Sequence, residues 1–212
     1  MLEAPRLLAA AILLACVTRT SGVVSGTAAR APAVVLAPSP VRVTFTAQSD
    51  SFASARDEYE ALWRDEGPRI VRVMEQVSGL RFDSPPYADT AIGAVVFEGV
   101  SNSGYRATPM RLRASYPHET KQATLVHELG HRLQTGIAHR DEDEHEILCL
   151  WLYDTWTALW GQPFADAQVR VERERGGPYP RAGAAALALD SAARTARFTA
   201  LVRRPSIHSG LP

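Results

Sequence analysis

Three side chains in the segment "TLVHELGHRLQ" (124–134) have the types and spacing of a metal site. His127 and His131 are four residues apart, so on an α-helix their rings project from one face about one turn apart and can bind the same ion. Glu128 follows the first histidine and can reach a water molecule on that ion without being a ligand itself. The segment therefore predicts a helix that carries two metal ligands, His127 and His131, and one acid–base group, Glu128.

This combination of residues predicts hydrolysis with the help of one Zn²⁺ ion. Zinc lowers the pKa of a bound water toward about 7, and a neighbouring carboxylate can take its proton as the water attacks a carbonyl. Chance is the rival explanation, because roughly half a per cent of chains of this length would contain the pattern at ordinary residue frequencies.

The residues around the motif help to decide between a metal site and a chance occurrence of the pattern. Apolar residues at 125, 126, 129 and 133 indicate a helix with one buried side. Two imidazoles and a carboxylate are costly to bury unless they bind a metal ion or are hydrogen-bonded. Gly130 costs about 1 kcal/mol relative to Ala in a helix interior, and a glycine there permits close approach by another backbone. We therefore expect a metal site, and the alternative is a buried, hydrogen-bonded histidine pair.

The third ligand is expected in the acidic segment "DEDEHE" (141–146). We expect it to be His145, which begins a mostly apolar helix far enough after His131 for a turn and an antiparallel return. The alternative is that His145 caps the helix or lies on the surface. Glu142 or Glu146 would then be the ligand, with Glu172 in "VRVERER" as a more remote choice.

The stretch "LVHELGHRLQ" resembles the active-site helix of zincin metallopeptidases. The resemblance implies a small, antiparallel-rich sheet, an active-site helix beneath its edge strand, and further helices that supply the last ligand. Residues 43–203 are also similar to small, uncharacterised prokaryotic HExxH proteins, in which a turn and a second helix follow the motif and His145 lies at the matching position.

The subgroup of zincins is less well defined by the sequence. Metzincins would place Gly and His where this chain has Gln134 and Ile137, so that branch is disfavoured. Gluzincins take a Glu from a following helix, so a histidine at 145 would depart from the gluzincin pattern.

The hydrophobic pattern predicts an α+β domain over residues 41–205. Alternating apolar and polar residues predict strands at 41–47, 91–99 and 110–116. Arg111 and Arg113 favour an edge position for the last of these strands. Helical spacing predicts a helix that Gly67-Pro68 interrupts, followed by four more helices; the ranges are 53–66, 69–79, 119–134, 141–161, 164–175 and 183–203. The helix at 141–161 is apolar almost all round, which predicts a central position.

Composition limits the class of protein. The 212 residues suit one domain, and 23 basic residues balance 23 acidic residues, so no basic field favours nucleic acid. Residues 1–22 contain an apolar run that resembles a signal peptide, and residues 23–40 resemble a flexible linker. Residues 206–212 are expected to form a frayed tail. We therefore expect export to the bacterial envelope or beyond, or a cytoplasmic protein if the start is misassigned.

Two cysteines occur in the chain. Cys16 lies in a loose lipobox, so membrane attachment through its lipidation is a secondary expectation. Cys149 lies in the apolar segment "ILCLWL" and is expected to be a small buried side chain without a disulfide partner.

The sequence thus predicts a zinc-dependent metallopeptidase in which Glu128 is the general base and His127, His131 and His145 bind Zn²⁺. A peptide would bind in extended form along the strand at 110–116. Tyr105 and Tyr116 could donate to an oxyanion, but packing is the more ordinary role of each. The alternatives are a zinc hydrolase that acts on other bonds and a metal-stabilised binding module without turnover.

Overall fold

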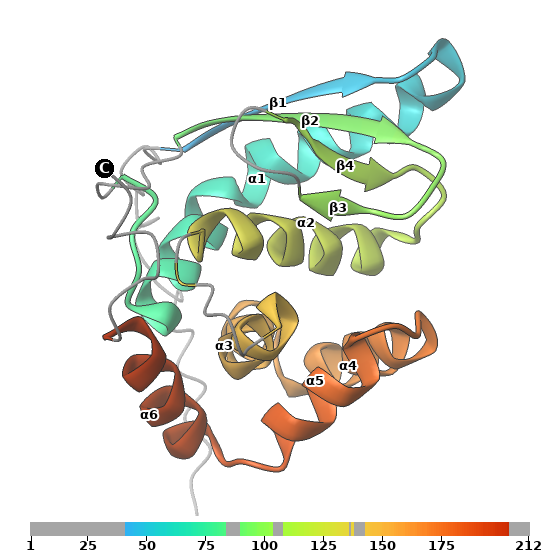
Figure 1. Cartoon of the computed structure of the whole chain (residues 1–212). Coiled ribbons are helices and arrows are strands. Elements are labelled where there is room, and N and C mark those ends of the chain that lie inside the picture. The colour runs from blue at the N-terminus through green and yellow to red at the C-terminus, as the bar shows by residue number, and fades with distance from the viewer. Residues whose placement is uncertain (1–40, 84–89, 104–107, 136, 138–142, 204–212) are drawn as a thin grey trace, which may run out of the picture. The chain divides into compact units, whose positions relative to one another are not determined.

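The computed structural model describes residues 41–83, 90–103, 108–135, 137 and 143–203 and confirms an α+β domain. Helices α1 and α2 cover one face of a four-stranded sheet, and α3 lies on the other side of α2 (Figure 1). Alternate residues of the first two strands are exposed. Because the other residues of these strands face the helices, the main core lies between the sheet, α1, α2 and α3.

The sheet contains β1 (Arg42–Ala47), β2 (Ala91–Phe97), β3 (Asn102–Ser103) and β4 (Met110–Arg113) in the order β1-β2-β4-β3. β1 pairs with β2 and β2 with β4 in parallel, and only β3 pairs with β4 in antiparallel fashion. The expected antiparallel-rich sheet is therefore wrong, because α1 makes a parallel crossover from β1 to β2.

The expected edge position of strand 110–116 is also wrong. β4 lies between β2 and β3, because the two-residue strand β3 pairs with its outer side. Nothing in the polar segment around β3 has the alternation that predicts a strand. Arg111 packs over the Phe97 ring at 3.9 Å, and Arg113 donates to Glu98 at 2.6 Å. The arginines of β4 therefore stabilise neighbouring segments instead of protecting an edge.

Helix α1 (Ala53–Ser78) is continuous through Pro68, so the expected interruption at Gly67-Pro68 is wrong. Proline removes one backbone donor. Apolar residues on both sides of Pro68 are buried in the core, and this packing favours one continuous helix. Tyr59 packs on Phe45 and donates a hydrogen bond to the Arg113 carbonyl at 3.0 Å, which fixes α1 to both β1 and β4. The helix ends at Gly79, whose φ of 71° is the left-handed conformation typical of a C-terminal glycine.

Helices α2 (His118–Leu133) and α3 (Glu144–Trp160) confirm the helices expected at 119–134 and 141–161. α3 is central, as expected, and packs on α1, α2, α4, α5 and α6. Its two buried tryptophans, Trp151 and Trp156, are each 2% exposed and are among the largest side chains in the core.

Helices α4 (Gln162–Glu174), α5 (Tyr179–Leu187) and α6 (Ser191–Val202) complete the described domain. The single helix expected at 183–203 is instead two helices. Asp190 interrupts it because its side chain accepts a hydrogen bond from the Ala193 amide and so begins α6. Arg194 of α6 forms an ion pair with Asp154 of α3 at 2.6 Å.

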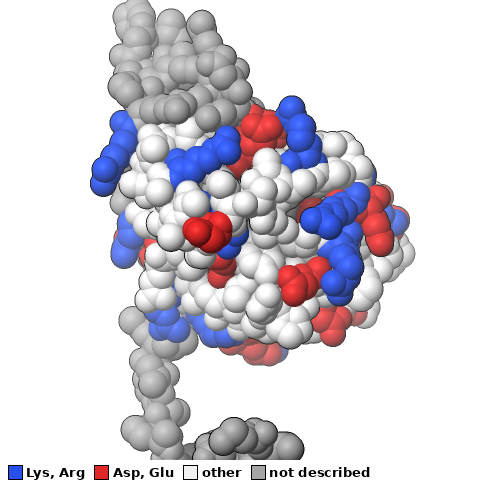
Figure 2. Space-filling view, turned by 90° about the horizontal axis from the view of Figure 1, so that it is seen from below, with Lys and Arg blue, Asp and Glu red and all other residues white. Residues whose placement is uncertain are grey.

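Several expectations fall on residues outside the described ranges: the signal peptide, the linker, Cys16 and the C-terminal tail. In the described part, no helix is long and apolar enough to cross a membrane. Lys and Arg are interspersed with Asp and Glu on the face of the molecule in Figure 2.

Gly130 is tightly packed, as its place in the motif predicts, although the approaching atoms are side chains and not backbone. A Cβ atom there would lie 2.5 Å from Leu148 Cδ1 and 3.2 Å from Trp151 of α3. Gly183 of α5 is a matched control, because a Cβ atom there would meet nothing within 4 Å.

We predict that Gly130→Val lowers the free energy of unfolding by about 1–3 kcal/mol through overpacking. Gly183→Val should leave it nearly unchanged or slightly higher. Urea denaturation of the metal-free proteins measures both values. Equal stability of the two variants would contradict the tight packing of α2 on α3.

Candidate metal centre

Helix α2 places His127 and Glu128 in the interior. These side chains are 1% and 2% exposed, and His131 is only partly covered. The apolar residues around the motif pack in the core with the sheet and α3, so the helix cannot turn its polar residues to solvent. The sequence therefore buries ionisable groups that need partners.

The three histidines His127, His131 and His145 lie close together in the structure. His127 Nε2 and His131 Nε2 are 3.2 Å apart. Zn–N bonds of 2.0–2.1 Å in a tetrahedral site place ligand nitrogens about 3.3 Å apart, so this separation fits one ion. His145 of α3 completes the group, and one ligand atom from each of the three residues lies within 4.8 Å of the others. The three histidines are thus close enough to bind one metal ion.

The links between α2 and α3 explain why His145 reaches this position. The Gln134 side chain, at the end of α2, donates to the Glu144 carbonyl at 2.8 Å. Asp143 caps α3 by accepting from the His145 amide at 2.8 Å, and the same Oδ1 lies 3.1 Å from His145 Nδ1. One aspartate therefore both begins α3 and orients the imidazole.

Each histidine has a carboxylate next to its Nδ1 atom. Asp143 lies beside Nδ1 of His145. Glu144 Oε2 lies 3.5 Å from His131 Nδ1, and Glu172 Oε1 of α4 lies 3.6 Å from His127 Nδ1. The last two distances slightly exceed a normal hydrogen bond. Metal-binding histidines usually have such partners, which hold the proton on one nitrogen and leave the other for the metal. The hydrogen bond with Asp143 leaves Nε2 of His145 for a ligand, whereas Nδ1 of His127 and of His131 has no hydrogen-bond partner among the described residues.

The electrostatic environment keeps two of the rings neutral. Burial lowers the pKa of His127 well below its usual value, and the other two histidines lower it further. Burial and His131 also lower the pKa of His145, although Asp143 opposes this. Neutral imidazoles have the free lone pair that a metal ion needs. The residues present therefore fit a divalent metal ion with a preference for nitrogen ligands.

Two carboxylates lie in or beside the motif, the buried Glu128 and the partly exposed Glu172. Burial, together with the charge of Glu172, raises the pKa of Glu128 to about 8. Burial raises the pKa of Glu172 to about 7 against the effect of Arg175. Arg175 donates to Glu172 at 2.9 Å and to Thr124 at 3.1 Å, so it holds the end of α4 against α2. Glu128 Oε2 has no hydrogen-bond partner among the described residues.

The other expected ligands do not join this group. Glu146 pairs with Arg181 at 3.0 Å, and Glu142 lies outside the described residues. Glu172, the remote candidate, reaches the centre but faces the Nδ1 side of His127. At 3.6 Å it forms no hydrogen bond with the ring, but it lies on the side from which a carboxylate can orient a metal-binding histidine.

Tyr179 was missed by the sequence reasoning. Its ring centroid lies 4.6 Å from that of His145 and 5.7 Å from that of His127. It begins α5 after Gly176 and Gly177, which have positive φ values of 74° and 62°. The segment "GGPY" indicates a turn and a helix start, but no local pattern shows which site that turn faces. Of the two expected tyrosines, Tyr105 lies outside the described residues.

Tyr116, the other expected tyrosine, lies between two cations. The guanidinium carbons of Arg113 and Arg175 are 5.4 Å and 5.0 Å from its ring centroid. This is the packing role that the sequence favoured for it.

Comparison with known proteins adds no assignment. No protein-family model, curated protein or solved structure matches this chain. The candidate metal site is therefore supported by its residues and their geometry alone.

The carboxylate beside His127 can be tested separately from the ligands. We predict that Glu172→Ala weakens Zn²⁺ binding roughly 10- to 100-fold, because His127 loses the group that orients it. Glu174→Ala, at an exposed position of the same helix, should bind Zn²⁺ as the wild type does. Competition with a chromophoric chelator measures the affinities, and equal values for both variants would exclude the orienting role of Glu172.

Proposed function

We propose that this protein is a zinc-dependent hydrolase of the metallopeptidase type, in which His127, His131 and His145 bind one Zn²⁺ ion and Glu128 is the general base. The observation that carries the proposal is the convergence of three histidines next to a buried carboxylate with an unpartnered oxygen. A purely structural metal site would not need Glu128 there.

The donor set favours zinc. Imidazole nitrogen suits zinc and also copper, iron and nickel. Three protein ligands with a free fourth position are typical of catalytic zinc sites, whereas structural zinc sites use four protein ligands. When bound, zinc polarises a carbonyl and lowers the pKa of water toward about 7.

Glu128 has the properties of a proton carrier. It follows His127 in α2, and its side chain is shielded from bulk water. Burial raises the pKa of Glu128 to about 8, so without metal the group is mostly protonated at neutral pH, and the charge of a bound Zn²⁺ would favour the ionised form that acts as the base. Glu128 would accept the proton of the attacking water and transfer it to the leaving amine.

Tyr179 is the candidate donor to the oxyanion that forms as the carbonyl is attacked. Burial raises the pKa of its hydroxyl to about 12, so the group stays protonated at neutral pH and can donate a hydrogen bond. Its ring packs edge-on against His145, which fixes its position beside the three histidines.

A peptide substrate would bind along the outer side of β3, and not along β4 as the sequence predicted. Strand β4 is paired on both sides, whereas β3 lies at the edge of the sheet that the described strands form. Arg132 of α2 donates to Ser103 of β3 at 2.9 Å, so this edge lies beside the motif helix. An extended peptide can add to such an edge through backbone hydrogen bonds.

We predict that Glu128→Gln lowers kcat/KM for peptide hydrolysis by about 10²- to 10⁴-fold, the usual effect of losing a general base. Zinc content should stay at one ion per chain. Glu119→Gln, at an exposed position of the same helix, is the matched control and should remain active. A library of peptides and a panel of small amides and esters measure the activity.

Each alternative has its own outcome in this experiment. Hydrolysis of the small substrates alone would indicate a non-peptidase hydrolase. Stabilisation by zinc without any turnover would indicate a binding module. Full peptide hydrolysis by Glu128→Gln would contradict the proposed role of Glu128.

A further inference from the structure

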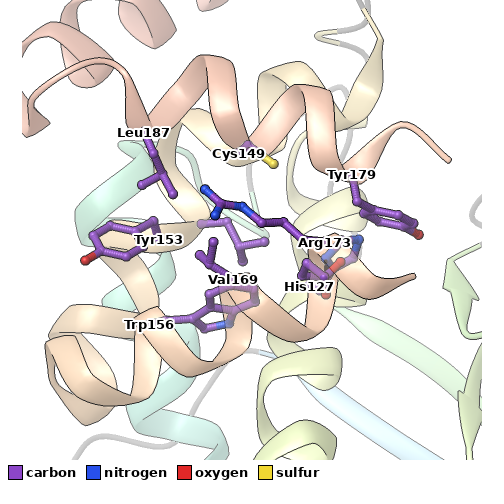
Figure 3. A pocket seen from close by; sticks show the side chains of 11 residues that line it. His127, Cys149, Tyr153, Trp156, Val169, Arg173, Tyr179 and Leu187 are labelled. Atoms are coloured by element: carbon purple, nitrogen blue, oxygen red, sulfur yellow. Dashed lines mark ion pairs between the residues drawn. The ribbon is translucent and has the colours of Figure 1, made fainter. Parts of the chain in front are cut away.

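An apolar pocket opens beside His127. It has a volume of about 30 Å³ and lies between α3, α4 and α5. His127 and Tyr179 lie at one end of the pocket, and Tyr153 and Trp156 lie at the other (Figure 3). Most of its wall is hydrocarbon, from Leu152, Trp156, Val169 and Leu187.

The helices that complete the candidate centre also form the wall of the pocket. On α3, Cys149, Leu152 and Trp156 follow His145 at helical spacing and so continue its face along the helix. On α5, Gly183 and Leu187 follow Tyr179 in the same way. The pocket therefore leads away from the three histidines between these two helical faces.

The size and chemistry of the pocket limit its ligand. About 30 Å³ is room for roughly two water molecules, which is near the size of an isopropyl group. Two charged residues also line the pocket: Glu172, which pairs with Arg175, and Arg173, which is exposed and can keep its guanidinium in solvent while its methylene groups face the pocket. A charged ligand group would lose its hydration against the remaining apolar walls. A short, branched aliphatic group fits best, whereas an indole ring is too large.

We infer that this pocket binds a valine- or leucine-sized side chain of the substrate next to the bond that is cleaved. The inference rests on the proposed hydrolase function and names its substrate class, which is peptides with a short aliphatic residue at this position. Tyr179 and His127, which touch both the pocket and the centre, would couple the side chain to the reacting bond.

Gly183 allows the pocket to be filled without a backbone clash. It lines the pocket, and a Cβ atom there meets nothing within 4 Å. A leucine at this position would extend into the space that the substrate side chain needs. Ala185→Leu, at an exposed position of the same helix, is the matched control.

The test compares leucine- and alanine-containing peptides in the zinc-loaded protein. We expect wild type and Ala185→Leu to prefer leucine over alanine by about 10- to 200-fold in kcat/KM, as hydrophobic pockets discriminate. Gly183→Leu should lose this preference through a lower kcat/KM for the leucine peptide. Zinc content and melting temperature should be unchanged in both variants.

Binding without turnover separates this inference from the proposed function. Leucine hydroxamate and alanine hydroxamate are suitable probes for calorimetry. The wild type should bind the leucine compound more tightly than the alanine compound, and Gly183→Leu should not. If the wild type shows this binding preference but hydrolyses no peptide, only the peptidase proposal is contradicted. Equal binding of the two probes by the wild type, or an unchanged preference in Gly183→Leu, would overturn the inference about the pocket.

Discussion

The burial of His127 and Glu128 in helix α2 is the constraint on which the rest of the structure depends. Apolar residues on both sides of the motif pack this helix between the sheet and α3, so these two groups cannot reach solvent. Each therefore needs a partner from another element. α3 brings His145 with Asp143, and α4 brings Glu172 and Arg175. The helices after the sheet thus bring histidine, carboxylate and arginine side chains to the buried motif, while Glu128 Oε2 stays without a hydrogen-bond partner among the described residues.

The sequence predicts those parts of the fold that local patterns determine. The alternation in β1 and β2 and the apolar faces of α2 and α3 gave correct elements, and the spacing of His127 and His131 gave their shared face. Predictions that depended on distant packing were wrong. The parallel pairing of β1 with β2 follows from the crossover through α1, and the inner place of β4 depends on two residues of β3 that carry no strand pattern.

The candidate site likewise contains residues that local sequence predicts and residues that only distant packing places there. His145 could be expected from its place at the start of an apolar helix, and the structure brings it to the other two histidines. Glu172 and Tyr179 lie far from the motif in the sequence, and only the packing of α4 and α5 on α3 places them beside it. Their local sequences indicate a charged helix end and a glycine turn, neither of which specifies a site.

A crystal structure of the zinc-loaded protein, with anomalous diffraction recorded on both sides of the zinc absorption edge, tests the central claim most directly. We predict one strong anomalous peak within about 2.0–2.1 Å of a ring nitrogen of each of His127, His131 and His145, with Glu128 outside bonding distance. A peak elsewhere, or one at which a carboxylate replaces His145 as the third ligand, would contradict it.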